Sequence, residues 1–208
     1  MKLGVLVSGS GTNLQAIVDA TREGRLAADV RVVVSNKEGA GGLVRAREAG
    51  VHTVVLDHRA YASREAFDGA LVDALRAEEV EWVVLAGFMR IVTRVLLDAF
   101  PMRVLNIHPA LLPAFPGVDA QAQALAYGVR VTGCTVHFVD AGTDTGPILA
   151  QTVVPVLPDD TVDTLKARLL VEEHALLVSS LAAVADGRVT VVSRGPGERP
   201  AVRIARPA

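Results

Sequence analysis

Short runs rich in valine and leucine alternate along this chain with segments whose apolar residues recur at helical spacing. The runs are apolar at consecutive positions, which is typical of parallel strands buried on both faces of a sheet. This alternation predicts an α/β fold with a doubly wound, mostly parallel sheet. Strands are predicted at 3–7, 30–34, 53–56, 82–86 and 103–107, and helices at 13–23, 42–49, 63–79 and 93–99.

The second half of the chain follows a different pattern. A loop rich in proline and glycine spans 109–118, and a second glycine-rich connection spans 140–147. The strands on either side of that connection predict an antiparallel C-terminal addition to the sheet. Gly187 suits a left-handed cap after the last helix, and a glycine/proline-rich stretch follows at 195–200. Strands are predicted at 131–139 and 148–154, a helix at 161–185, and a terminal hairpin at 189–192 and 201–204.

The composition excludes several classes of protein. A length of 208 residues suits one domain with a proper core. The net charge is −2 and the lysines and arginines do not cluster, so no nucleic-acid surface is expected. No apolar run reaches the roughly 18 residues of a membrane span, and the apolar start is too short for a signal peptide. The single cysteine, Cys134, excludes an internal disulfide and a cysteine-based zinc site. A cytoplasmic enzyme or binding protein is therefore predicted.

Asn106 and His108 lie at the end of the predicted strand 103–107. Side chains two residues apart in a strand point to the same face, and Pro109 ends the strand because it cannot donate to the ladder. An amide that can stabilise developing negative charge is thus expected beside an imidazole that titrates near neutral pH. This pair predicts a catalytic site, and the alternative is a strand end that carries two polar residues.

The first predicted strand runs into the glycine-rich turn Ser-Gly-Ser-Gly-Thr-Asn-Leu at 8–14. Leu14 stands where the dinucleotide fingerprint needs its third glycine, and no acidic residue closes the second strand, so NAD is not expected. The Walker A signature is also missing. The turn that remains opens a helix whose free N–H groups suit a phosphate or another anion. The alternative is a tight turn with no ligand.

Arg90 follows the predicted strand 82–86 within Ala-Gly-Phe-Met-Arg-Ile. An arginine beside exposed Phe88 and Met89 would suit a flat, partly anionic ligand. The alternative is an ordinary strand end with a surface arginine. Asp144 lies in the glycine-rich connection, and its carboxylate would favour a charged imidazole if it approached His108. The alternative there is a turn aspartate that bonds its own backbone.

Glu173 falls inside the apolar stripe of the predicted helix 161–185, four residues after Leu169 and three before Leu176. A carboxylate is rarely buried without a partner, so Glu173 is a candidate to bind sugar hydroxyls or an amine. The alternative is an edge residue that reaches water. The other histidines are expected to be structural, with His137 in the core or supporting the site. They are His52, His58, His137 and His174.

Several segments together resemble a known family. The pair Asn106 and His108 with downstream Asp144 resembles the folate-dependent formyltransferases as a group. The opening Gly-Ser-Gly-Thr-Asn-Leu and the chain length resemble the phosphoribosylglycinamide formyltransferase family within that group. The similar segments are 7–17, 84–91, 105–113, 135–139, 144–147 and 172–174.

The resemblance implies a Rossmann-like formyltransferase fold and formyl transfer from 10-formyltetrahydrofolate to the amine of glycinamide ribonucleotide in purine biosynthesis. It implies Asn106, His108 and Asp144 as catalytic residues and no metal. Single-domain organisation is implied over 1–208, with a phosphate-binding half at 1–100, a folate and catalytic half at 101–187 and a tail at 188–208. A homodimer is left open. The implied ribonucleotide contacts are Gly11, Thr12, Asn13 and Glu173, and the implied folate contacts are Arg64, Met89, Arg90, Ile91, Val92, Asn106, Asp140, Ala141, Gly142, Thr143 and Asp144.

The chain departs from the family pattern just after Pro113, where the family usually carries more histidine and basic residues. Asp119 and Gln121 put a histidine-based role at those positions in doubt. A hydrolase that deformylates the same folate would share the three catalytic residues but usually carries an extra N-terminal domain. Methionyl-tRNA formyltransferase shares the core but adds a C-terminal RNA-binding domain. A non-catalytic anion sensor would not need the catalytic set.

Overall fold

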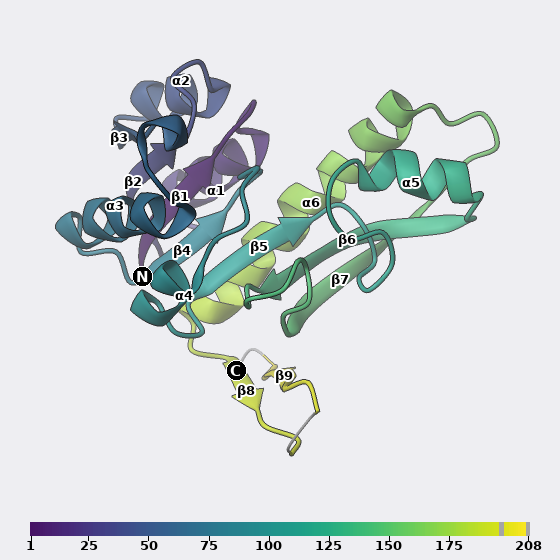
Figure 1. The fold of residues 1–208 in the computed structure, drawn as a ribbon. Helices are drawn as coiled ribbons and strands as arrows, with labels where there is room; N and C mark the ends of the chain where they lie inside the picture. Colours follow the sequence, from purple (N-terminus) through teal and green to yellow (C-terminus); the bar gives the residue numbers. More distant parts are fainter. Residues whose placement is uncertain (196–197, 207–208) are drawn as a thin grey trace. The chain divides into compact units, whose positions relative to one another are not determined.

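The computed structural model describes residues 1–195 and 198–206 and contains two compact units, Met1–Asn106 and Ile107–Ala208 (Figure 1). Residues 196–197 of the predicted glycine/proline-rich stretch and residues 207–208 of the predicted tail lie outside the described residues. Within the described part of the chain, no helix is both long and apolar enough to cross a membrane.

The first unit is built on parallel strands in the order β3-β2-β1-β4-β5. Their valine and leucine side chains are buried, as expected for strands covered on both faces. The positions of these strands confirm the predicted mostly parallel sheet. The strands are β1 (Lys2–Val7), β2 (Asp29–Ser35), β3 (His52–Val55), β4 (Trp82–Leu85) and β5 (Val104–His108).

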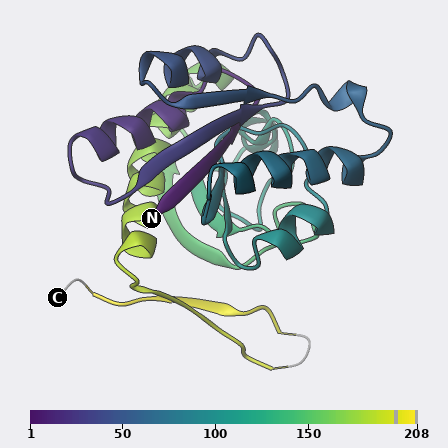
Figure 2. The ribbon, with the colours of Figure 1, turned by 90° about the vertical axis from the view of Figure 1, so that its left-hand side faces the viewer.

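Helices cover both faces of these strands, which makes the sheet doubly wound. The chain moves outward from β1 to β3 and then returns to the other side of β1, and right-handed crossovers therefore place the two pairs of helices on opposite faces. Helix α1 contacts α2 and α3 contacts α4, and Figure 2 shows the two pairs on either side of the strands. The helices are α1 (Thr12–Arg22), α2 (Gly41–Glu48), α3 (Arg64–Ala77) and α4 (Arg94–Ala99), with a 3-10 turn at His58–Ala60.

The strand order reverses between β1 and β4, and this position determines where the first unit can bind a ligand. Open α/β sheets bind ligands beyond the carboxyl ends of the strands at such a reversal. The glycine-rich turn follows β1 and the segment that contains Arg90 follows β4. Both predicted binding segments therefore lie at the reversal.

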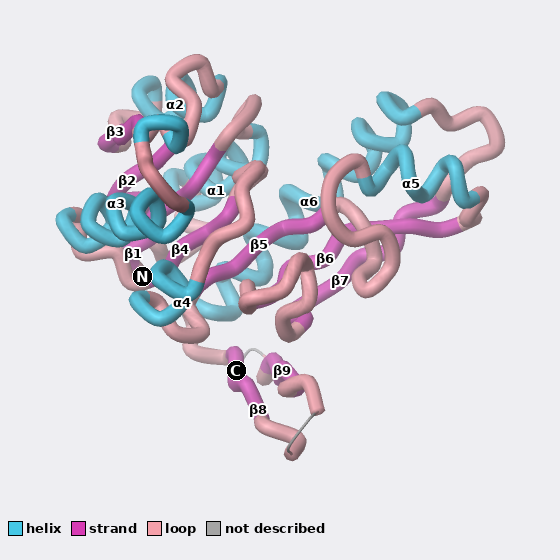
Figure 3. The backbone as a smooth tube through the Cα atoms, in the orientation of Figure 1, coloured by secondary structure: helices cyan, strands magenta, loops and turns pink. Residues whose placement is uncertain are grey.

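The second unit contains two antiparallel strand pairs, β6 with β7 and β8 with β9 (Figure 3). Both pairs were expected from the sequence, and the antiparallel C-terminal addition is confirmed. Helix α6 packs against β6 and β7. Thr161 and Thr164 form a capping box at its start, and Gly187 has a φ of 68° just after its end. The elements are β6 (Val131–Phe138), β7 (Ile148–Pro155), α6 (Val162–Ala185), β8 (Val189–Val192) and β9 (Ala201–Ile204).

Helix α5 (Ala120–Tyr127) was not predicted. Its sequence Ala-Gln-Ala-Gln-Ala-Leu-Ala-Tyr contains good helix formers but little apolar contrast, so no stripe marks one face. The sequence did contain two indications of this helix. One is the run of alanine and glutamine, and the other is Gly128, which ends the helix with a φ of 84°. The Leu112–Pro113 peptide bond is cis.

Candidate active site

His108 is buried at the end of β5, and both nitrogens of its ring face oxygen atoms. Nε2 donates a hydrogen bond of 2.8 Å to the main-chain carbonyl of Phe115. Nδ1 lies 3.4 Å from Oδ2 of Asp144. A carbonyl oxygen only accepts, so Nε2 carries the proton of its hydrogen bond to Phe115. The predicted approach of Asp144 to His108 is therefore present in the structure.

Asp144 is held by several groups at once. Its Oδ2 accepts a hydrogen bond of 2.7 Å from the Gly117 N–H, and its Oδ1 lies 3.6 Å from Nε2 of His137. Burial by itself would raise the pKa of Asp144. Hydrogen bonds from His137 and Gly117 and the charges of His108 and His137 outweigh that effect, and the pKa lies below its ordinary value. The carboxylate is therefore ionised at neutral pH.

His137 is part of this group, although the sequence placed it only in the core or in a supporting role. It is buried in β6, and its Nδ1 donates a 2.9 Å hydrogen bond to the Phe138 carbonyl. Its Nε2 faces Asp144, so one carboxylate lies between two histidines. A fully buried imidazole in an apolar strand needs polar partners, and that requirement was the signal available in the sequence.

The loop that carries Phe115 and Gly117 is anchored to β6 and β7. The Thr135 hydroxyl donates to the Ala110 carbonyl at 2.7 Å and accepts from the Leu112 N–H at 3.1 Å. The Gln151 amide donates to the Leu112 carbonyl and to the Thr135 hydroxyl, each at 2.9 Å. These contacts fix the beginning of the loop that supplies the acceptor for His108.

The connection that carries Asp144 is also tightly organised. Asp140 accepts hydrogen bonds from the Gly142 N–H at 3.1 Å and the Thr145 hydroxyl at 2.6 Å. Gly146 packs so closely that an added Cβ would collide with the Phe138 carbonyl oxygen. Asp144 itself has a φ of 55°, in the left-handed region that a non-glycine residue seldom adopts. The contacts on either side of Asp144 hold this conformation, while residues 141–143 are exposed.

Asn106 lies two residues before His108 on β5, in register with Leu85 of β4. It is partly buried, and the spacing directs its side chain to the same face of the strand as that of His108. Asn106 and His108 thus both lie in β5, at its carboxyl end.

The glycine-rich turn leads into α1 as predicted. Gly11 is the N-cap residue with a φ of 75°, and no side chain caps the helix. Thr12 and Asn13 form the first turn of α1, which contains no acidic residue, so its N–H groups suit an anion. A Cβ at Gly11 would collide with the Cα of Gly42, so a glycine is required there. The Arg45 guanidinium donates to the Ser10 carbonyl at 2.9 Å and adds a positive charge beside the turn.

The buried Ser8 hydroxyl links three strand ends at the reversal of strand order. It donates to Oδ1 of Asn36, which follows β2, at 2.6 Å, and accepts from the Met89 N–H, which follows β4, at 2.9 Å. The Ser8 N–H also donates to the Gly87 carbonyl at 3.1 Å. These bonds fix the start of the segment that includes Arg90.

The segment after β4 exposes part of its surface. Met89 and Ile91 are exposed, whereas Val92 is buried. The expectation that Phe88 is exposed was wrong, because the residue is only 8% exposed and belongs to the core. The Arg90 guanidinium instead lies over the ring of Phe67 on α3, 5.1 Å from the ring centre.

Arg64 is the first residue of α3 and is exposed. The predicted N-cap before it is confirmed, because the Ser63 hydroxyl accepts a 3.0 Å hydrogen bond from the Ala66 N–H. The carboxylate of Asp68, one turn into α3, accepts from the Thr93 N–H. Burial raises the pKa of Asp68, against the opposing effects of its bonds to Thr93 and the Arg90 charge.

Glu173 is buried on α6, as the apolar stripe predicted. Burial, together with the charges of Glu173 and Glu172, raises the pKa of the Cys134 thiol to about 12. Cys134 is therefore a protonated core residue and not a nucleophile. No group of three or more histidine, cysteine, aspartate or glutamate side chains among the described residues is arranged to hold a metal ion.

Comparisons with known proteins agree on one family. The formyl transferase family model matches residues 1–181. A phosphoribosylglycinamide formyltransferase of Mycobacterium tuberculosis is 50% identical over 194 residues, which cover 93% of this chain and 89% of that protein. The crystal structure of glycinamide ribonucleotide transformylase 1 from Symbiobacterium toebii aligns with a TM-score of 0.94 at 53% identity, covering 99% of this chain and 94% of that one.

Some relatives are much longer. The trifunctional purine biosynthetic protein adenosine-3 of Drosophila melanogaster is 45% identical over 192 residues, which are 91% of this chain but only 14% of that protein. This chain thus corresponds to one segment of the longer relative. The family match and the similarity along nearly the whole chain lead to the same conclusion. The chain belongs to the formyl transferase family.

Proposed function

We propose that this chain transfers a formyl group from 10-formyltetrahydrofolate to the amine of glycinamide ribonucleotide, a step of de novo purine biosynthesis. The observation that carries the proposal is the buried contact of 3.4 Å between His108 and Asp144 at the end of β5, in a chain of the formyl transferase family. Simple binding of an anion would not need a buried carboxylate shared by two histidines. A cytoplasmic location and a homodimer stay predictions.

The proposed mechanism proceeds through a tetrahedral intermediate. The amine of the ribonucleotide attacks the formyl carbon and forms a C–N bond, and the carbonyl oxygen becomes an oxyanion. The Asn106 amide donates a hydrogen bond to that oxyanion. His108 donates a second one from Nε2, which exchanges the Phe115 carbonyl for the oxyanion when substrate is bound. One such donor typically lowers the barrier by roughly 3–4 kcal/mol.

Collapse of the intermediate then breaks the bond to the folate nitrogen. The attacking nitrogen loses a proton and the leaving folate nitrogen gains one, so the proton count balances with His108 as the group that helps the transfer. Asp144 stabilises the charged imidazole through this cycle, and its lowered pKa keeps it ionised. Cys134 forms no covalent intermediate because its thiol stays protonated.

The proposed substrate contacts are those that the family resemblance implies. We assign the ribonucleotide phosphate to Gly11, Thr12 and Asn13, supported by the uncapped start of α1. Glu173 would bind the ribose end. The proposed folate contacts are Arg64, Met89, Arg90, Ile91, Val92, Asn106, Asp140, Ala141, Gly142, Thr143 and Asp144.

One assay tests the proposal. The protein is mixed with 10-formyltetrahydrofolate, with and without glycinamide ribonucleotide, and release of the deformylated folate is followed by absorbance. Release only in the presence of the ribonucleotide, together with formylated ribonucleotide in the products, is the expected result. Equal release without the ribonucleotide would instead identify a hydrolase, and no release in either mixture would refute formyl transfer.

A further inference from the structure

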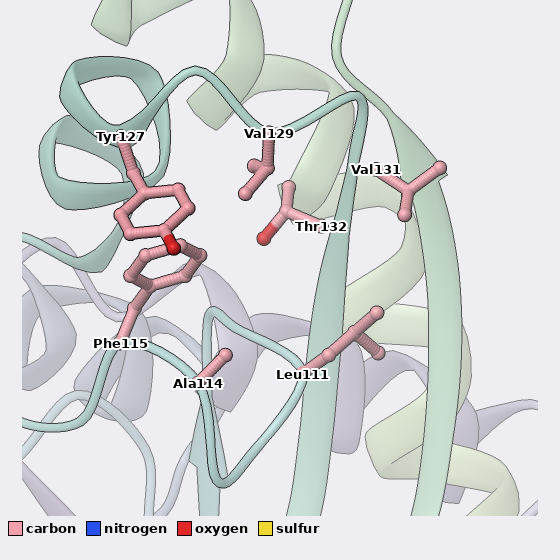
Figure 4. A pocket seen from close by; sticks show the side chains of 7 residues that line it. All are labelled: Leu111, Ala114, Phe115, Tyr127, Val129, Val131 and Thr132. Atoms are coloured by element: carbon pink, nitrogen blue, oxygen red, sulfur yellow. The ribbon is translucent and has the colours of Figure 1, made fainter.

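The second unit contains a pocket of about 410 Å³ that the proposed mechanism does not use (Figure 4). Its volume lies within the range of small-molecule sites, and most of its lining is apolar. The lining comes from the loop before α5, from the end of α5 and from the beginning of β6. The lining residues are Leu111, Ala114, Phe115, Tyr127, Val129, Val131 and Thr132.

One polar atom in this apolar lining has no partner. Thr132 is 2% exposed, and its hydroxyl oxygen forms no hydrogen bond with the described residues. Figure 4 shows that oxygen pointing into the pocket. A buried hydroxyl without a partner destabilises the folded state, and valine, which has nearly the same shape, would avoid that cost. The hydroxyl is therefore explained best by a ligand that bonds to it.

Two aromatic rings form the opposite wall. Phe115 and Tyr127 meet edge to face, with ring centres 5.9 Å apart and planes at 64°. Tyr127 is 80% exposed, so most of its surface remains free to contact a ligand. Aromatic pairs favour further ring contacts of offset or edge-to-face geometry. The wall therefore suits a flat aromatic molecule.

We propose that this pocket binds a small aromatic molecule that carries one hydroxyl group. The ring lies between Phe115, Tyr127 and Val129, and its hydroxyl bonds to the Thr132 hydroxyl after a small adjustment of the neighbouring side chains. Binding does not depend on the proposed formyl transfer, because none of the proposed substrate contacts lines the pocket.

The pocket is connected to His108 through one residue. Phe115 places its ring in the pocket wall, and its carbonyl accepts the hydrogen bond from His108. Its φ of 52° is left-handed, so a shift of the ring also moves a constrained main chain. A bound ring should therefore change the surroundings of the His108 imidazole.

The test uses p-cresol and toluene as probes of the full chain, with binding followed by two-dimensional NMR. These molecules differ only in the hydroxyl, so p-cresol should bind about fivefold more tightly than toluene to the wild type, as one net hydrogen bond provides. Thr132→Val should remove that preference without reducing thermal stability. Thr152→Val makes the same change on the neighbouring strand, outside the pocket, and should keep the preference. The His108 ring signals should shift when p-cresol binds.

A second variant, Val129→Phe, tests the pocket independently of the Thr132 hydroxyl. Val129→Phe fills the pocket and should weaken the binding of both probes at least tenfold while the amide spectrum stays dispersed. Equal binding of p-cresol and toluene to the wild type would overturn the proposal, and so would a marked loss of stability in Thr132→Val. A dimer in light scattering that Val129→Phe dissociates would show that a second copy covers this face, which would also overturn it. Binding without any shift of His108 would refute the connection through Phe115.

Discussion

Asp144 connects two histidines and a loop through a single carboxylate. His108, His137 and the Gly117 N–H all contact its two oxygens. Removing the carboxylate therefore affects the proposed proton-transfer group and the loop at the same time. This arrangement predicts that a negative charge, and not only a polar side chain, is needed at this position.

Replacement of the proposed catalytic residues should lower the rate more than the affinity. Asn106→Ala and Asp144→Ala should each reduce kcat by roughly 10²- to 10³-fold, because each loses stabilisation of the oxyanion or of the imidazolium that donates to it. KM should change only a few-fold. Steady-state kinetics with both substrates measures this, with the exposed Asp159→Ala as a matched control that keeps wild-type rates. Wild-type turnover in Asp144→Ala would refute the assignment.

The lowered pKa of Asp144 also predicts how stability depends on pH. Its ionised form stabilises the folded state fully above the unfolded carboxyl value of about 4, and this contribution is lost as pH falls through the lower folded-state pKa. Urea unfolding of wild type and Asp144→Asn between pH 6 and pH 3 measures the effect. The wild type should be more stable at pH 6, and the difference should shrink toward pH 3. A difference that stays constant over this range would contradict the expected ionisation.

At the scale of elements, β6 holds the loop beside His108 in position through hydrogen bonds of Thr135. This residue is fully buried, and its hydroxyl bonds to two main-chain groups of the loop that begins at Ala110. The strand and the loop therefore act as one unit in positioning Phe115.

Thr135→Val should test this support. The variant keeps the shape but leaves the Leu112 N–H and the Ala110 carbonyl without the hydroxyl, which should cost roughly 1–3 kcal/mol of unfolding free energy. The rate of formyl transfer should also fall because the acceptor for His108 becomes less ordered. Thr135→Ser retains the hydroxyl and should restore the rate even if stability is not fully recovered. Equal rates in Thr135→Val and the wild type would show that the loop needs no such support.

The elements also show what the sequence can and cannot predict. Consecutive valines and leucines identified the parallel strands, and Ser63 and Gly187 marked helix ends, because these signals are local. Helix α5 was missed because alanine gives no apolar contrast. The contact of His137 with Asp144 spans only seven residues, but it depends on how the connection after β6 folds back, which no local pattern specifies. The burial of Phe88 likewise depends on packing that a strand end does not reveal.

At the scale of the whole molecule, ligand binding should raise the free energy of unfolding and therefore Tm. A ligand that binds only the folded chain adds about 2.7 kcal/mol at a concentration of 100 times its Kd. Glycinamide ribonucleotide should therefore raise Tm by roughly 5–10 °C under these conditions, given the usual relation for a chain of this size. Differential scanning fluorimetry measures the shift.

The variant Glu173→Gln tests the proposed ribose contact, because it removes the carboxylate charge of that residue. Its Tm should rise much less at the same ribonucleotide concentration. Glu172→Gln changes the neighbouring position on α6 and should respond like the wild type. A full shift in Glu173→Gln would show that Glu173 does not contact the ribonucleotide, although the assignment of the phosphate to the glycine-rich turn would be unaffected.

The loop beside His108 contributes to the site through its main chain. The Phe115 carbonyl accepts from the imidazole and the Gly117 N–H donates to the carboxylate. A substitution at 115 still supplies a main-chain carbonyl, whereas a single-residue insertion or deletion between Pro113 and Gly117 would move both groups out of reach. The length of this loop should therefore be under stricter selection than the identity of its side chains, and homologous sequences should tolerate substitutions there far more often than changes in length.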